Sequence, residues 1–139
     1  MMEDYFRKVK NYLLELNCEI VTEQENEGVL VVTKPGEGIV NLVLGCVDPL
    51  LIMEQFIFEI NEDNMSVFKQ LLMKNRDIVH GAFVLDETGR KVIFRDTLQI
   101  ENLDLNELEG SINSLGLLLS EYANEIIKFS SKELYHERI

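Results

Sequence analysis

The segment from Leu50 to Ile60 constrains the fold more than any other part of this sequence. Successive side chains of a strand point to opposite faces, so a strand with one face in water alternates apolar and polar residues. Here apolar residues fall on both faces, with Leu50, Ile52, Phe56, Phe58 and Ile60 on one and Leu51, Met53 and Ile57 on the other. We therefore expect a central strand that is shielded from water on both sides.

The remaining periodicity predicts an α+β fold in the order α-β-β-β-β-α-β-β-α, with a mostly antiparallel sheet packed by helices. Short extended runs between turn residues predict the strands, and apolar residues at helical spacing predict the helices. The expected ranges are a helix over 5–16, strands over 19–24, 29–33, 39–46 and 50–60, a helix over 63–75, strands over 82–85 and 91–98, and a helix over 104–129. We expect one domain over residues 1–139, of which 130–139 form a frayed polar tail.

Local signals mark the boundaries of the last hairpin and the last helix. Gly89 can take the left-handed conformation that a three-residue hairpin loop needs. Asp104 and Glu107 have the spacing of a capping box, and Leu103 and Leu108 stand where a hydrophobic staple would close it. These two elements should therefore begin and end close to the predicted residues.

The charge balance excludes several classes of partner. Thirteen Lys and Arg stand against 25 Asp and Glu, which gives a net charge of −12, and the basic residues are scattered rather than clustered. Nucleic-acid binding depends on clustered cations that neutralise phosphates, so neither nucleic acid nor an anionic membrane is an expected partner. The first residues show no basic region followed by an apolar run, so we expect no signal peptide, and no apolar stretch reaches membrane-spanning length. We expect a cytoplasmic protein whose acidic surface favours a basic partner segment.

The side chains of common catalytic and metal sites are not grouped in this sequence. Cys18 and Cys46 are expected to be buried free thiols, and His80 and His136 lie far apart, so no metal site and no cofactor are predicted. His80 as a base and Glu54 as a carboxylate with a raised pKa are the two candidates for acid–base chemistry. Glu54 could equally pair with Arg95, and His80 is more typical of a structural histidine. We therefore predict no catalytic residues and no enzyme activity.

The doubly apolar strand predicts a homodimer, because we expect three helices of one chain to leave part of a six-stranded sheet uncovered. Burying two or three such side chains between molecules contributes about 1.5–3 kcal/mol each before the costs of association. The predicted interface residues come from this strand and from the second helix: Leu51, Met53, Ile57, Met65, Phe68 and Leu72. The alternative is a strand covered entirely by helices of its own chain.

Four stretches carry a resemblance to known families. The segment from Gly81 to Arg95 resembles the strand, turn and strand before the last helix of the YbjN-like family and of class I type III secretion chaperones, and residues 106–127 are similar in pattern to that last helix. Residues 39–44 and 50–54 also resemble YjfI-like proteins, which are often encoded beside phage-shock membrane proteins. The resemblance covers about residues 3–129 and rests on element order and apolar positions.

The resemblance implies a small, acidic, homodimeric, cytoplasmic protein that holds an extended segment of a partner protein against its first helix and its sheet. On this sequence the candidates for partner binding are Tyr5, Val9 and Tyr12 on the first helix, with Val29 and Val31 on an expected outer strand. A small-molecule-binding sensor or regulatory domain and a stress-related, phage-shock-associated adaptor are the alternative functions. Fold alone does not decide among them.

Overall fold

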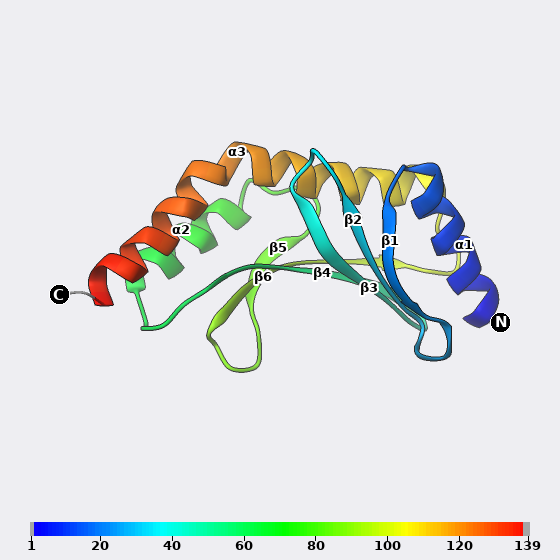
Figure 1. Ribbon diagram of the computed structural model, residues 1–139, viewed down its shortest axis with the longest axis horizontal. Helices are drawn as coiled ribbons and strands as arrows, with labels where there is room; N and C mark the ends of the chain where they lie inside the picture. Colours follow the sequence, from blue (N-terminus) through cyan, green and yellow to red (C-terminus); the bar gives the residue numbers. More distant parts are fainter. Residues whose placement is uncertain (1, 138–139) are drawn as a thin grey trace.

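The structure is a computed structural model that describes the backbone of residues 2–137 and the side chains of residues 4–129. Its elements follow the predicted order (Figure 1). They are α1 (Met2–Glu15), β1 (Glu19–Gln24), the short 3₁₀ helix η1 (Glu25–Glu27), β2 (Val29–Lys34), β3 (Ile39–Val47), β4 (Leu50–Glu59), α2 (Met65–Asn75), β5 (Ala82–Leu85), β6 (Lys91–Gln99) and α3 (Leu105–Glu137).

The strands form one six-stranded sheet in the order β1-β2-β3-β4-β6-β5, and all neighbouring strands are antiparallel. The first four strands form an antiparallel meander because short turns join them. Helix α2 separates β4 from the β5–β6 hairpin, which then adds to the sheet with β6 beside β4. Strand β4 therefore lies inside the sheet, as its apolar sequence predicts.

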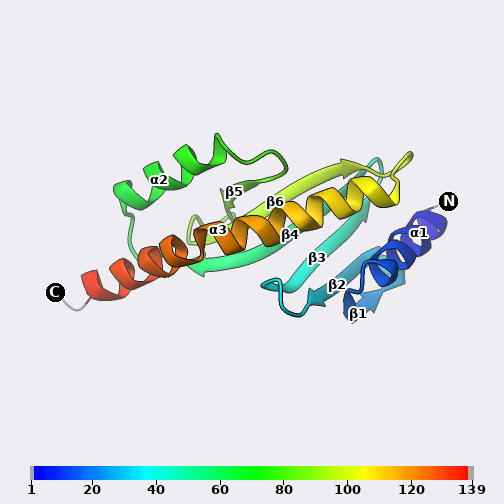
Figure 2. The same ribbon diagram turned by 90° about the horizontal axis from the view of Figure 1, so that it is seen from above.

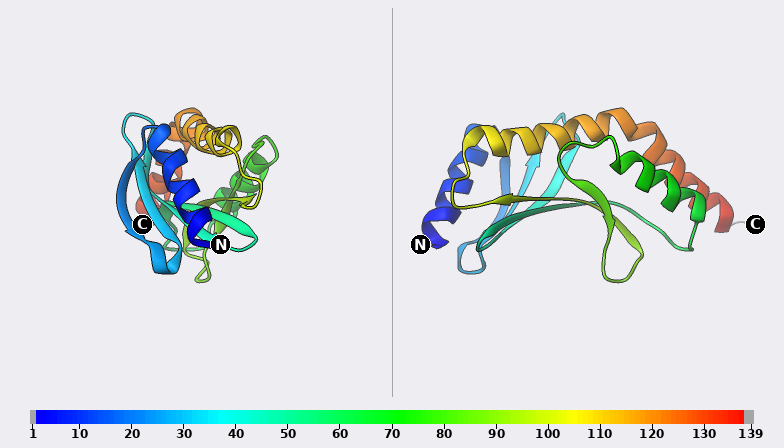
Figure 3. Two further views of the ribbon diagram at one scale, coloured as in Figure 1. Left: turned by 90° about the vertical axis from the view of Figure 1, so that its right-hand side faces the viewer. Right: turned by 180° about the vertical axis from the view of Figure 1, so that it is seen from behind.

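All three α-helices lie on the same side of the strongly twisted sheet (Figures 1 and 3). Helix α3 runs along the length of the sheet, α1 lies over the β1–β3 end, and α2 lies beside β5 at the other end (Figure 2). The main core fills the space between helices and sheet, and its largest buried side chains include Phe6, Leu13, Leu44 and Phe94. We call this side of the sheet the covered face and the other side the open face.

Helix boundaries are set by the capping residues that the sequence predicts. The Asp104 side chain accepts a hydrogen bond from the Glu107 backbone N–H at 2.8 Å, while Leu103 and Leu108 are both buried. Asn64 caps α2 in the same way through the Val67 N–H, at 3.2 Å. These contacts satisfy backbone donors that have no partner inside the helix.

A β-bulge in β4 changes which of its side chains face the helices. Phe56 pairs with Ile93 and Phe58 pairs with Val92, so Ile57 is an extra residue without a partner in β6. The alternation therefore shifts by one, and Phe58 and Ile60 lie on the covered face with Leu51 and Met53. The prediction that Phe58 and Ile60 share a face with Leu50, Ile52 and Phe56 was wrong, because strict alternation does not reveal an inserted residue.

A buried side chain of β4 holds the loop between β2 and β3. The buried Gln55 side chain donates to the Gly38 carbonyl and accepts from the Val40 N–H, both at 3.2 Å, and so fixes the β2–β3 loop beneath α3.

The predicted tail is helical to Glu137, because residues 130–137 contain neither Gly nor Pro to end α3. Residues 138–139 of that tail and the side chain of His136 lie outside the described residues.

Candidate partner-binding surfaces

The open face of the sheet is apolar although none of the described helices covers it. Its side chains come from four inner strands: Val29 and Val31 of β2, Val43 and Val47 of β3, Leu50, Ile52, Glu54 and Phe56 of β4, and Ile93 and Arg95 of β6. Val43, Val47 and Phe56 are 41%, 57% and 53% exposed. A row of apolar residues on an exposed sheet face is the signature of an interaction surface.

The register of the strands explains why these residues gather. Val43 pairs with Glu54, which pairs with Arg95, and Gly45 pairs with Ile52, so side chains from three strands stand in rows across the face. Phe56 lies beside Ile93 in the same way. Together they line a shallow hollow of about 580 Å³ whose rim is formed in part by Asp86 and Lys91 of the β5–β6 hairpin.

The polar groups of the open face neutralise one another. Arg95 donates to Glu54 at 2.9 Å, and the two side chains are 41% and 36% exposed. An ion pair this exposed contributes at most about 1 kcal/mol to stability. Glu54 thus has the Arg95 partner that the sequence allowed for, and the open face is electrically balanced at its centre although the chain carries −12 overall.

A second apolar surface lies where α2 meets the end of β5. Met65, Leu72 and Met73 of α2 are 84%, 70% and 62% exposed, and Leu85 of β5 is 45% exposed. Beside them is a pocket of about 230 Å³, lined by apolar side chains that include Phe68 and Phe83. We call this area the α2–β5 surface.

The residues predicted for a dimer interface divide between core and surface. Leu51 and Met53 are 0% and 2% exposed beneath the chain's own helices, so they were wrongly assigned to an interface. The reason is that they occupy the covered face of β4. Ile57 is half-buried at the bulge and packs against the core. Phe68 is half-buried, whereas Met65 and Leu72 are exposed on the α2–β5 surface.

The residues predicted for partner binding divide in the same way. Val9 is 0% exposed because it faces the core from α1, so its assignment was wrong, while Tyr5 and Tyr12 are half-buried. Val29 and Val31 are half-buried on the open face. Their strand, β2, lies inside the sheet between β1 and β3, which corrects the expected outer position.

Sequence reasoning missed the open-face residues of β3 although their signal was present. Leu42, Leu44 and Cys46 are buried, and the intervening Val43 and Val47 are exposed. Both sets are apolar, so the alternation could not show which face the helices would cover.

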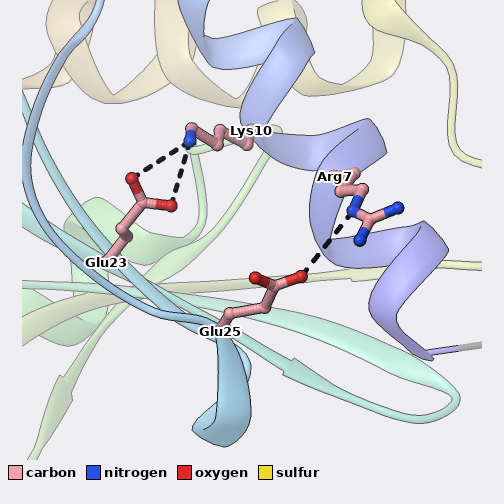
Figure 4. Close-up of polar contacts among 4 residues, drawn as sticks. All are labelled: Arg7, Lys10, Glu23 and Glu25. Atoms are coloured by element: carbon pink, nitrogen blue, oxygen red, sulfur yellow. Dashed lines mark hydrogen bonds and ion pairs between the residues drawn. The ribbon is translucent and has the colours of Figure 1, made fainter.

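Helix α1 is held over β1 by two ion pairs. Lys10 reaches Glu23 at 3.0 Å and Arg7 reaches Glu25 at 3.7 Å (Figure 4). The buried side chains Phe6 and Leu13 lie about one turn from Lys10 along the helix and pack in the core. The position of α1 is therefore set mainly by apolar burial, with ion pairs at the solvent edge.

Within the described residues, the titratable groups with shifted pKa values are two buried thiols and one carboxylate in a turn. Burial raises the pKa of the Cys46 thiol to about 11, and burial also raises the pKa of Cys18 against the opposing charge of Lys34. A hydrogen bond from the Thr88 hydroxyl, at 2.7 Å, lowers the pKa of Asp86 in the hairpin turn. His80 is exposed, and its carbonyl accepts a bond from Ser114 Oγ at 3.3 Å. Over the part of the chain that the structure describes, no cluster of three or more His, Cys, Asp or Glu could hold a metal ion.

Comparisons with known proteins agree with this architecture. The CesT_Tir_1 family model, which represents a type III chaperone family, matches residues 2–132. YbjN from E. coli, a candidate transcription regulator, superposes with a TM-score of 0.63 and 10% identity over 84% of this chain and 90% of its own. A chain of the HopA1–SchA chaperone–effector complex superposes with a TM-score of 0.63 and 13% identity, over 88% of this chain and 96% of its own.

These likenesses confirm the predicted fold and the resemblance to the YbjN-like and type III secretion chaperone group. A comparison with curated protein sequences gives no match. The resemblance to YjfI-like proteins stays a prediction. None of the helices within the described residues has the length and apolar character needed to cross a membrane.

Proposed function

Because this chain belongs to the CesT_Tir_1 family, we propose that it is a non-enzymatic binding module that holds a segment of a partner protein. The observation that carries the proposal is the open face, an apolar sheet surface left bare by three α-helices that all lie on the other side. Covering side chains such as Phe56, Val43 and Val47 contributes up to about 1.5–3 kcal/mol each, before the costs of association. Val29 and Val31, half-buried on the same face, extend the proposed contact area, and Tyr5 and Tyr12 on α1 form a separate candidate contact on the covered side.

We further propose a homodimer that forms through the α2–β5 surface. Met65 and Leu72 are among the most exposed apolar side chains on the described part of the chain, and Phe68 lines the adjacent pocket. Two copies of this surface could bury the exposed α2 side chains against each other's pockets. The open faces of both copies would then stay free for partner segments.

The charge of the chain supports a protein partner, and we keep the cytoplasm as the proposed location. A net charge of −12 repels nucleic acid and anionic membrane and attracts basic peptide segments. A sensor of small molecules is less well supported, since the α2–β5 pocket, at about 230 Å³, is smaller than ordinary ligand pockets of about 300–1,000 Å³. The open-face hollow, at about 580 Å³, has the volume of a ligand pocket, but it is shallow and open to solvent and so would enclose little of a small molecule.

Co-purification at native expression level tests the binding function. Wild-type chain, the open-face double variant Val43→Ser/Phe56→Ser and the control Leu14→Ser would be compared. Leu14 is exposed to 49% on α1, outside the open face, so its variant removes similar apolar area elsewhere. We expect wild type and Leu14→Ser to recover the same partner and the double variant to lose it. Equal recovery by all three would contradict the proposal.

A further inference from the structure

We infer that the partner segment docks on the open face as an amphipathic α-helix with basic flanks, and not as a strand added to an edge of the sheet. This inference rests on the proposed binding function and specifies its partner. Adding a strand needs an edge whose backbone N–H and C=O groups are free and regularly spaced. Neither edge of this sheet meets that condition.

The β5 edge is closed by a side chain. Asn75, at the end of α2, donates from Nδ2 to the Phe83 carbonyl at 3.0 Å and accepts from the Phe83 N–H at 2.7 Å. One amide group thus takes both backbone positions that a neighbouring strand would use at Phe83. Since β5 has four residues, little free edge remains for another chain.

The β1 edge is interrupted by a bulge. The pairing of β1 with β2 shifts between Ile20 and Thr22, which leaves Val21 outside the register. The regular ladder is therefore two residues long before the bulge and three residues long after it, over Glu19–Ile20 and Thr22–Gln24. A bulge in an edge strand twists its backbone groups away from a straight incoming strand.

The open face itself offers no backbone partners. Strands β2, β3, β4 and β6 each have a neighbour on both sides, so their N–H and C=O groups are used within the sheet. A segment that lies on this face must satisfy its own backbone groups, because leaving them unpaired in an apolar contact is costly. An α-helix satisfies this requirement internally, and an extended chain does not.

The shape and charge of the face fit one side of such a helix. Gly45 lines the hollow, and a Cβ atom at this position would meet no atom within 4 Å. The space above it can take a large apolar side chain of the partner, with Val43 and Val47 on the same strand and Ile52 opposite on β4. The Glu54–Arg95 pair is already satisfied, so apolar contact dominates the centre, while the net charge of −12 favours Lys and Arg at the helix flanks.

Two fluorescent 18-residue peptides of identical Leu and Lys content test this inference. One repeats Leu at helical spacing and the other alternates Leu and Lys as a strand would. Binding to the full chain is followed by fluorescence anisotropy in about 0.5 M salt, where non-specific attraction is screened. We expect the helical peptide to bind about tenfold or more tightly than the alternating peptide. Equal or tighter binding of the alternating peptide overturns the inference.

A variant that fills the hollow locates the site. Gly45→Leu should weaken binding of the helical peptide about tenfold, and Gly110→Leu, which adds the same atoms on α3 where a Cβ also meets nothing within 4 Å, should leave it unchanged. Amide hydrogen exchange over residues 19–24 should be the same with and without peptide. Protection of those amides, an unaffected Gly45→Leu variant or no binding of either peptide would overturn the inference. The co-purification of the native partner would still decide the binding function separately.

Discussion

The covered and open faces of the sheet are built by the same strands from the same kinds of residue, and they differ in what lies over them. On β3, Leu44 and Cys46 are 0% and 7% exposed, whereas their neighbours Val43 and Val47 are 41% and 57% exposed. Apolar side chains on the covered face are explained by folding, because the helices of the same chain bury them. Those on the open face add little to the stability of one molecule, and binding is the physical reason to keep them there.

We expect the largest effect on the free energy of unfolding when one phenylalanine on each face is replaced and the two variants are compared. Phe94 is 1% exposed beneath the helices and Phe56 is 53% exposed on the open face. Phe94→Ala should lower the free energy of unfolding by about 3–5 kcal/mol, and Phe56→Ala should change it by less than about 1 kcal/mol. Urea denaturation of both variants measures the difference. Similar losses would mean that the open face is buried in the folded protein.

Two glycines give a second test of the same contrast. At Gly81, with φ of +84°, an added Cβ would lie 2.3 Å from the Phe94 ring, whereas at Gly45 it would meet nothing within 4 Å. Gly81→Ala should therefore cost about 2–4 kcal/mol, through overpacking and backbone strain. Gly45→Ala should be neutral or stabilise by up to about 1 kcal/mol, since alanine loses less backbone entropy. Thermal unfolding distinguishes the two, and a destabilised Gly45→Ala would show that the open face is already filled.

Mutations can show whether the dimer contact and the partner contact use different surfaces. Met65→Ser/Leu72→Ser should weaken self-association at least about tenfold, because it removes exposed apolar side chains from the α2–β5 surface. Val43→Ser/Phe56→Ser should leave self-association unchanged. Sedimentation equilibrium measures both. If the open-face variant alone became monomeric, the open face would be the dimer contact and would no longer be available to a partner.

How much of this contrast could be predicted from the sequence depends on the element. Element order and most boundaries followed from periodicity and from local caps such as Asp104, because these signals act between residues close in the chain. The two faces could not be assigned, since Val43 and Leu44 are equally apolar and only the tertiary position of the helices makes one of them core. The bulge at Ile57 was missed for the same reason, because it is defined by pairing with β6.

The cysteines and three apolar residues show what the sequence could and could not predict about binding sites. Cys18 and Cys46 were expected to be buried free thiols, and both are. Val9, Leu51 and Met53 were assigned to interfaces although they face the core, because an apolar stripe does not state what covers it. A sequence can therefore supply the list of apolar surfaces, and the fold decides which of them are left for other molecules.

The smallest expected effect concerns thiol chemistry on the two faces. Burial raises the pKa of Cys46 to about 11, above its value of 9.0 in an unfolded chain, so Cys46 stays protonated and unreactive at neutral pH. Because the pKa of Cys46 is higher in the folded protein than in the unfolded chain, the free energy of unfolding depends on pH. The contribution of Cys46 to this free energy is fully present below about pH 9 and is lost as the pH rises through about 11. A disulfide reagent should label Cys46 slowly at pH 8 and label an introduced Val47→Cys thiol, on the adjacent open-face position, at a rate typical of exposed thiols. Equal rates would contradict the assignment of faces.

Site-specific photo-crosslinking in the living cell tests the central claim most directly. A benzophenone amino acid would replace Phe56 on the open face, with the same replacement of Leu14 on the exposed side of α1 as the control. We expect a discrete adduct between position 56 and one partner protein, identified by mass spectrometry, and little adduct at position 14. Crosslinking at position 14 alone, or no adduct at either position, would contradict it.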